Sequence, residues 1–349
     1  MLEIFLGDKI YTQRTPNSKI VEFDLNGIKL NTYDELPIEV KEIIKLNKNM
    51  ELYPDDYFEY KIIDNAVTIT KIKDCLDIKK YLRIPEQIKG YPVTRLQDAI
   101  QKNQKERLRQ INLPNTLEEL SFGCFSDCYA LKYINIPNKI KTIPTDCFRR
   151  CWKLSQIDLN NVTKIEFGAF DDCRSLSKID LTKITDLEER CFRSCSVLET
   201  VIMPEKIKII PPEIFYACKN LKKINLSDSI KIISHAAFFC CESLEEINIP
   251  KDLKLIQDNA FQRSGIKIFN APENLRTIGK GAFWNSKIEE INLNKKLNTI
   301  GGFAFLMCKQ IKKINIFNNT TYEDDTFDFE NKLKINIINE EKNNIQKER

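Results

Sequence analysis

The chain has 349 residues, of which 42% are apolar and 30% are charged, a composition typical of a soluble protein that builds a core. Its 54 basic and 50 acidic residues leave a net charge of +4, which argues against nucleic acid or an anionic membrane as the default partner. A single histidine, His235, excludes a cluster of histidine metal ligands, and the chain contains no glycine-rich phosphate-binding motif.

The start of the chain, MLEIFLGDKIYTQRTPN, has no basic region and only a short apolar run, so it does not resemble a secretory signal. No window approaches the length of an apolar membrane span. Twelve cysteines without a signal favour a reducing compartment. We therefore expect a cytoplasmic protein, with display at the cell surface by a non-classical route as the alternative.

Residues 1–56 are predicted to form a small N-terminal cap or domain. The stretch 19–33, KIVEFDLNGIKLNTY, alternates around Asn26-Gly27, a strong signal for a two-residue hairpin. The stretch 34–50, DELPIEVKEIIKLNKNM, is predicted to be an amphipathic helix that Asp34 can cap. Because the ends of repeat arrays need covering, we expect this hairpin and helix to cover the first repeat.

The beginning of the predicted helix also allows a different interpretation. Leu36-Pro37-Ile38-Glu39-Val40 followed by Ile44 resembles the opening of an F-box, which would make the protein a substrate receptor of a ubiquitin ligase through residues 34–50. Lys41 stands where an F-box has an apolar residue, and the strands that begin near residue 57 leave too little chain for three helices. The capping function is therefore favoured.

A repeat of 22–23 residues dominates the rest of the chain. Its unit is L-x-x-I-x-x-x-A-F-x-x-C-x-x-L-x-x-I-N-I-P-x-x, and nine full copies run from about residue 117 to 319. The central phenylalanines are Phe125, Phe148, Phe170, Phe192, Phe215, Phe238, Phe261, Phe283 and Phe305. Alternating stretches such as KIDL (178–181) and KINL (223–226) predict one short strand in each unit.

The period lies within the range of leucine-rich repeats. No unit can bury its apolar positions alone, so successive units stack around a shared core, with strands about 4.8 Å apart in a parallel sheet. We therefore predict an α/β repeat solenoid over residues 93–319, with about nine to ten coils and a cap at each end. About ten coils at this spacing extend roughly 48 Å.

The repeat also explains most of the cysteines. One row follows the phenylalanine by three residues, as Cys241 follows Phe238, and a second row takes the alanine position, as Cys124 does. Both rows are predicted to be small buried fillers without metal, although pairs such as Cys124 and Cys128 have ligand-like spacing. Cys240 and Cys75 belong to neither row.

The A-F-x-x-C-x-x-L-x-x-I-x-I-P unit resembles the BspA-like leucine-rich repeat family over about residues 57–319. Residues 57–92 resemble the lead-in of that family, with a short hairpin in YKIIDNAVTITKI (60–72) before LRIPEQIKGYPVTRL (82–96). The resemblance implies an interaction module, often exposed on bacteria or protists, where members bind host or matrix proteins. Fold family alone does not identify the ligand.

Three coils depart from the family pattern. The first has Ile100 in the phenylalanine position and a charged insert, QKNQKER, which is predicted to bulge out as a loop. The coils with Ser264 and Ser286 in the cysteine position are one residue short.

Residues 320–338 are predicted to form a last partial coil that covers the core with Phe327, Leu333, Ile335 and Ile337. The polar tail, residues 339–349, is expected to fray.

Side chains that point outward from the strands are free from packing and form two columns on a wall predicted to be concave. The candidate partner-binding residues on this wall are Tyr133, Asp158, Lys178, Asp180, Ile202, Lys223, Glu246, Ile268 and Glu290. The Asp158–Asp180 patch, Ile202 and Ile268 are its distinctive positions. The alternative is a solvated polar face in which side-chain amides form hydrogen bonds between coils.

No group of residues marks a catalytic pocket, and no basic run with interleaved aromatic residues predicts nucleic-acid binding. We therefore expect a non-enzymatic module, without metal or cofactor, that binds a protein partner on the strand wall. A ubiquitin-ligase receptor or a cell-surface adhesin is the alternative.

Overall fold

The computed structural model describes residues 2–6, 9–13, 20–24, 27–31, 54–73, 81–311, 313–327 and 334–338. Side chains are described from residue 54 onward, except those of Tyr81, Lys313 and residues 334–338. Several predictions fall outside the described residues. They are the helix at 34–50 with the F-box alternative that depends on it, Cys75, Leu333 and the tail 339–349.

The N-terminal segment forms an antiparallel sheet of four strands in the order β1-β2-β3-β4. The strands are β1 (Leu2–Leu6), β2 (Lys9–Gln13), β3 (Ile20–Asp24) and β4 (Gly27–Asn31). Pairing of β3 with β4 up to Asp24 and Gly27 confirms the predicted hairpin. The hairpin of β1 and β2 was not predicted, although a Gly-Asp dipeptide between them is a hairpin signal.

A second hairpin covers the beginning of the solenoid. It follows the 3-10 turn η2 (Asp55–Tyr57) and consists of β5 (Phe58–Ile63) and β6 (Ala66–Ile72). Asp64 and Asn65 between them have φ of 49° and 60°, the left-handed pair that a tight hairpin turn needs. Strand β6 pairs in parallel with β9 (Tyr91–Leu96), and β8 (Gln87–Ile88) pairs antiparallel with β9.

The charged insert of the first coil forms the short helix α2 (Lys102–Lys105) rather than the predicted loop. Gln104 is buried there, and its Nε2 donates to the carbonyl of Ile72 at 2.9 Å. The insert therefore ties the first coil to the end of β6.

Most coils contribute strands to two parallel ladders on different sides of the stack, and the coil around residues 156–158 has no strand on the first face. The first face is the ladder predicted from the sequence, hydrogen-bonded in three runs. Its strands are β7 (Tyr81–Arg83), β10 (Gln110–Asn112), β12 (Tyr133–Ile134), β15 (Lys178–Asp180), β17 (Thr200–Ile202), β19 (Lys223–Ile224), β21 (Glu246–Ile247), β23 (Ile268–Asn270), β25 (Glu290–Asn292), β27 (Lys313–Phe317) and β29 (Lys334–Ile338).

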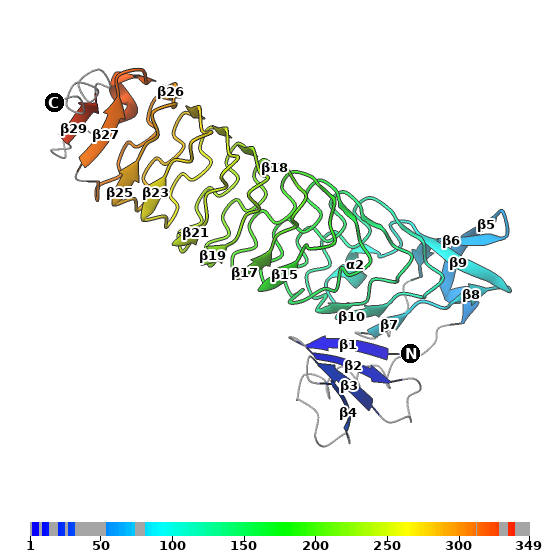
Figure 1. The fold of residues 1–349 in the computed structure, drawn as a ribbon. Coiled ribbons are helices and arrows are strands. Elements are labelled where there is room, and N and C mark those ends of the chain that lie inside the picture. The colour runs from blue at the N-terminus through cyan, green and yellow to red at the C-terminus, as the bar shows by residue number, and fades with distance from the viewer. Residues whose placement is uncertain are drawn as a thin grey trace, which may run out of the picture.

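The second face was not predicted, because only one strand per coil was expected. It continues from β9 through β11 (Glu119–Leu120), β13 (Thr142–Ile143), β14 (Lys164–Ile165), β16 (Asp186–Leu187), β18 (Ile209–Ile210), β20 (Ile232–Ile233), β22 (Leu255–Ile256), β24 (Thr277–Ile278), β26 (Thr299–Ile300) and β28 (Thr321–Tyr322). Figure 1 shows an extended stack with β15 to β25 along one side and β18 and β26 on the other.

The third side of each coil is a series of tight turns around the repeat phenylalanine. The N–H groups of Asp146, Phe148 and Arg150 donate to carbonyls of the next coil at 2.9, 2.8 and 2.7 Å. This pattern recurs along the stack, with left-handed residues two before and two after the phenylalanine. The two left-handed columns are Gly123, Asp146, Gly168, Arg190, Glu213, Ala236, Asn259, Gly281 and Phe303, and Asp127, Arg150, Asp172, Ser194, Ala217, Cys240, Arg263, Asn285 and Met307.

Cys240, which belonged to neither predicted cysteine row, is thus a member of the second left-handed column. These turns stand where an α/β protein has helices, and α2 is the only α-helix among the described residues. The leucine-rich-repeat solenoid is therefore confirmed, but it is mostly sheet rather than α/β.

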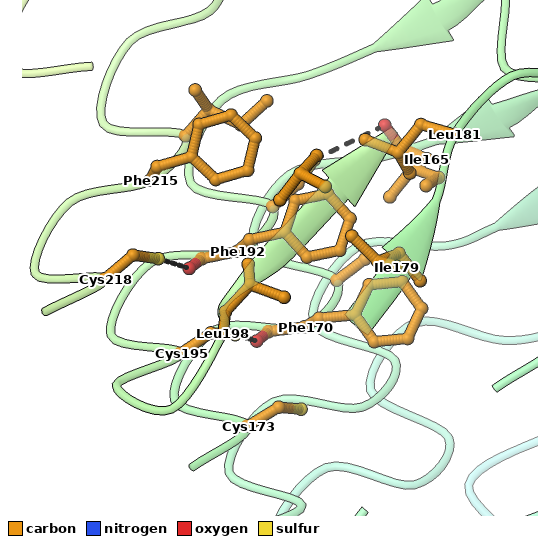
Figure 2. Close-up of a cluster of buried hydrophobic side chains, with 14 of the residues drawn as sticks. Ile165, Phe170, Cys173, Ile179, Leu181, Phe192, Cys195, Leu198, Phe215 and Cys218 are labelled. Atoms are coloured by element: carbon orange, nitrogen blue, oxygen red, sulfur yellow. Dashed lines mark hydrogen bonds between the residues drawn. The ribbon is translucent and has the colours of Figure 1, made fainter. Parts of the chain in front are cut away.

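The core follows the repeat phenylalanines. Neighbouring rings from Phe125 to Phe305 have centroids 5.2–5.9 Å apart, and all nine are almost fully buried. Figure 2 shows part of this column at Phe170, Phe192 and Phe215. Since rings of this kind contact their neighbours on both faces, the column links the coils into one continuous core.

The cysteine row does more than fill space. In six coils the thiol donates to the carbonyl of the preceding repeat phenylalanine, as Cys195 does to Phe170 at 3.3 Å and Cys218 to Phe192 at 3.2 Å (Figure 2). Burial raises the pKa of thiols of this row such as Cys195 and Cys218, and it raises the pKa of Cys124, in the alanine-position row, to about 12, so these thiols stay protonated at neutral pH.

The C-terminal end continues the stack. Phe327 is buried against Phe305 with ring centroids 5.7 Å apart, next to the turn η3 (Asp324–Thr326). Strands β28 and β29 extend the second and first faces by one more parallel pairing each. Ile335 and Ile337 lie in β29 opposite Ile314 and Ile316.

Candidate partner-binding surface

Eight of the nine predicted partner-binding residues lie in strands of the first face, which are paired in register within each hydrogen-bonded run, and Asp158 lies in the coil that forms no strand there. Lys178 stands opposite Thr200, and Thr200 opposite Lys223, with the buried Ile179, Val201 and Ile224 between the two outward columns. Seven of the nine candidates are exposed: Lys178, Asp180, Ile202, Lys223, Glu246, Ile268 and Glu290. Tyr133 and Asp158 are half-buried.

The asparagines of this face bind the backbone. Asn135 accepts from the N–H of Leu113 at 2.7 Å and donates to its carbonyl at 2.9 Å, and Asn248 makes the same pair of bonds with Leu226 at 2.6 Å each. Asn292 donates to the side-chain oxygen of Asn270 at 2.8 Å. The alternative of a polar face with amide bonds between coils therefore applies at these positions.

The two aspartates have a local structural role. Asp158 accepts from the N–H of Asn160 at 3.0 Å, and Asp180 accepts from the N–H of Thr182 at 2.9 Å. An aspartate that bonds the backbone two residues ahead stabilises the turn that follows. Burial raises the pKa of the Asp158 carboxyl, against the hydrogen bond from Asn160, which lowers it. These carboxylates are therefore committed to the turns of their own coils.

The remaining charged candidates make weaker contacts. Lys223 and Glu246 form an ion pair of 2.7 Å whose side chains are 59% and 68% exposed, which stabilises the fold little because water screens it. The Nζ of Lys132 lies 5.0 Å from the centre of the Tyr133 ring.

Among the described side chains of this face, Ile202 and Ile268 are the two exposed aliphatic ones, at 40% and 54% exposure. They lie in β17 and β23, three coils apart, which corresponds to about 14 Å along the stack. Because Ile202 and Ile268 are this far apart and charged residues surround each of them, they form two separate apolar contact points within a polar surface.

The turn side carries a different arrangement, in which charged and aromatic side chains engage one another. Arg190 and Glu213 form two hydrogen bonds of 2.9 and 3.1 Å, and the Trp152 indole donates to Asp172 at 3.0 Å. These hydrogen bonds connect neighbouring coils and stabilise the turns. Asp171 is different, because burial raises its pKa to about 6, although Arg193 and Arg149 oppose this shift, and its ionised form is therefore disfavoured in the folded protein.

The prediction missed the outward residues of the second face, because the strand there was not recognised. The signal was present: Lys208-Ile209, Lys231-Ile232 and Lys254-Leu255 precede successive buried isoleucines at the repeat period. Over residues with described side chains, no three His, Cys, Asp or Glu converge in a way that fits a metal ion. No helix in the described part of the chain is long and apolar enough to cross a membrane.

The family model of the BspA type leucine-rich repeat region matches residues 102–199, 142–267 and 231–348. Together these matches cover more than half of the chain. The chain belongs to the BspA type leucine-rich repeat family. Membership in this family indicates a protein-interaction or surface-protein module, and it accounts for the repeat phenylalanines and the parallel stack. No curated protein matches the sequence.

Solved structures of similar fold come from bacteria. A leucine-rich repeat protein from Bacteroides ovatus has a TM-score of 0.70 and 26% identity, over 82% of this chain and 78% of that one. A leucine-rich cell surface protein from Faecalibacterium prausnitzii has a TM-score of 0.55 and 21% identity, over 82% and 94%. The pneumococcal vaccine antigen PcpA has a TM-score of 0.53 and 17% identity, over 85% and 96%. The last two resemble this BspA type chain in fold alone.

Proposed function

We propose that the protein is a non-enzymatic binding module that holds a protein partner on the first face. The observation that carries this proposal is the exposure of Ile202 and Ile268 on hydrogen-bonded strands of the first face, in β17 and β23. Aliphatic contact points surrounded by polar side chains are the usual composition of a protein interface. Membership in a family of interaction modules supports the same conclusion.

The division of labour within each coil supports this choice of face. Inward residues such as Val201 hold the core, and the amides and aspartates of the outward columns hold turns and neighbouring strands. The exposed candidates that bond neither a turn nor the backbone are Lys178, Ile202, Lys223, Glu246, Ile268 and Glu290, of which Lys223 and Glu246 pair with each other and Glu290 accepts from Asn292. Because the ladder fixes their positions, a partner would bind them without a large loss of conformational entropy in this chain.

The test is affinity capture with the full-length protein, followed by mass spectrometry of the retained proteins. Ile202→Arg and Ile268→Arg should each reduce retention of a specific partner at least tenfold, which corresponds to about 1.4 kcal/mol. Met307→Arg is the matched control, because Met307 is exposed to a similar extent, 39%, but lies on the turn side. Loss of capture with Met307→Arg, combined with full capture by both isoleucine variants, would contradict the proposal.

A further inference from the structure

The second face carries a stripe in which basic and aliphatic side chains run next to each other. Its basic column is Lys208, Lys231, Lys254 and Arg276, and its aliphatic column is Ile209, Ile232 and Leu255; we call this set the basic–aliphatic stripe. Ile209, Ile232, Leu255 and Thr277 stand directly opposite one another in β18, β20, β22 and β24. Ile209 is 48% exposed, and Ile232 and Leu255 are half-buried.

The basic column is not neutralised within the described part of the chain. No carboxylate there forms an ion pair with Lys208, Lys231 or Lys254, and Arg276 donates to the backbone carbonyls of Glu273 and Leu275. By contrast, Lys164 on the same face contacts the carboxylates of Glu166, Asp186 and Glu188 within 4 Å. The stripe therefore differs from the part of this face around Lys164, where carboxylates of the same and the next coil neutralise the lysine.

Four acidic residues lie close in sequence to the basic column, and the side chains of two of them are paired with other lysines. They lie in the turns before the basic column, at Glu205, Asp228, Asp252 and Glu273. Asp228 pairs with Lys251 at 3.1 Å, and Glu273 pairs with Lys296 at 3.9 Å. The stripe therefore offers positive charge beside an apolar surface, which is complementary to an acidic and apolar ligand.

The spacing of the stripe selects the form of that ligand. Successive coils are about 4.8 Å apart, so the four basic residues span about 14 Å. Positions i, i+3, i+7 and i+10 of an α-helix span about 15 Å along its axis, at a mean step of about 5 Å. Same-face residues of an extended strand are separated by about 6.8 Å and fall out of step after one interval.

We propose that the basic–aliphatic stripe binds an amphipathic helix of a partner protein, laid along the stack. One edge of the helix carries Asp or Glu at i, i+3, i+7 and i+10, opposite the basic column. Apolar residues next to this edge pack on Ile209, Ile232 and Leu255. Binding an amphipathic helix by its apolar face is a common mode of peptide recognition. This surface is separate from the first face and independent of the function proposed for it.

A membrane is the less suitable ligand for this stripe. Interfacial anchors insert large apolar side chains several ångströms into the lipid. Ile232 and Leu255 are half-buried between neighbouring strands, and Ile209 is the one aliphatic side chain of the stripe that is exposed, at 48%, so the stripe presents a mostly shallow apolar surface. A helix can pack closely against such a shallow surface, whereas half-buried side chains do not extend far enough to insert among lipid chains.

The test measures binding of a labelled synthetic helical peptide with glutamates at i, i+3, i+7 and i+10 and leucines beside them, by fluorescence anisotropy at low salt. Lys231→Glu combined with Lys254→Glu should weaken binding at least tenfold, and Ile232→Ser about threefold or more. Lys153→Glu combined with Lys309→Glu is the control with the same change of charge on exposed residues of the turn side, and should change binding less than twofold. Circular dichroism checks the fold, and Lys231→Gln with Lys254→Gln replaces the charge reversal if that variant unfolds.

Three outcomes would overturn this proposal. The first is that a peptide of the same composition, with its glutamates clustered, binds as tightly as the patterned peptide. This would indicate charge attraction that does not depend on the spacing of the glutamates. The second is unchanged binding by the Lys231 and Lys254 variants. The third is binding of vesicles of phosphatidylcholine and phosphatidylserine without binding of the patterned peptide, which assigns the stripe to membranes. Ile202→Arg should leave peptide binding unchanged, so failure on one face is distinguishable from failure on the other.

Discussion

Replacing Ser264 with alanine should stabilise the protein, although it removes a polar group from the core. Ser264 occupies the cysteine position of its coil and is 1% exposed, and its hydroxyl has no hydrogen-bond partner among the described residues. In six other coils a thiol at this position bonds the preceding phenylalanine carbonyl. A hydroxyl is held closer to its own backbone than a thiol, because the C–O bond is shorter than the C–S bond. At Ser264 it makes no such bond.

A buried polar group without a partner costs about 1–3 kcal/mol. We expect Ser264→Ala to recover about 1–2 kcal/mol, because the methyl group needs no partner and the removed atom leaves only a small void. In a protein of this size, that corresponds to a rise of a few degrees in the midpoint of thermal unfolding. Ser264→Cys tests the same reasoning, because the thiol reaches toward the carbonyl of Phe238 as its equivalents do.

The control is Ser286→Ala in the neighbouring coil. Ser286 is also buried, at 3% exposure, but its hydroxyl lies 3.3 Å from the sulfur of Cys308. Its loss should destabilise the protein by about 0.5–1 kcal/mol. Urea unfolding followed by circular dichroism measures both changes as shifts of the midpoint at constant slope. The reasoning is refuted if the two variants shift the midpoint in the same direction.

Three further results are expected. Phe192→Ala should lower the free energy of unfolding by about 3–5 kcal/mol, because the ring is fully buried and stacked on both sides; a urea midpoint that hardly moves would show that the column does not hold the coils together. Ala217→Gly should raise the free energy of unfolding by up to about 1 kcal/mol, because Ala217 has a left-handed φ of 58°. Ala130→Gly, at a turn residue without a left-handed φ, should lower the free energy of unfolding by about 0.5–1 kcal/mol. If thermal unfolding shows that both glycine variants raise the midpoint, or that both lower it, the left-handed φ does not explain the effect at Ala217. Burial raises the pKa of Asp171 to about 6, above its unfolded value near 3.9, so the stability that this group contributes is full below the unfolded value and is lost as the pH rises through 6. Asp171→Asn should therefore stabilise the protein by about 1–2 kcal/mol at pH 7 and flatten the dependence of the unfolding free energy on pH between pH 4 and 6. A pH dependence that is the same in the variant and the wild type would contradict the assignment.

The sequence by itself determined the architecture, because the repeat period is a direct record of stacking. A large apolar residue such as Phe192 at a fixed interval has a physical meaning only if each coil places it against the next. The same interval identified Cys195 and its equivalents as core residues and identified the outward positions of the first face. The hairpins around Asn26-Gly27 and within residues 60–72 followed from local turn chemistry, which needs no tertiary context.

The tertiary structure decided features that depend on contacts between coils. A two-residue strand such as Thr277–Ile278 is too short to show alternation, and only its pairing with neighbouring coils makes it a strand. Arg190 and Ala217 are not residues that favour a left-handed conformation, and the ladder of hydrogen bonds to the next coil imposes it on them. The same holds for the functional surfaces. The sequence does not show that the Asp158 carboxylate accepts a hydrogen bond from a backbone N–H. Likewise, Lys208, Lys231 and Lys254 form one stripe only because the parallel register places residues 23 positions apart in neighbouring strands.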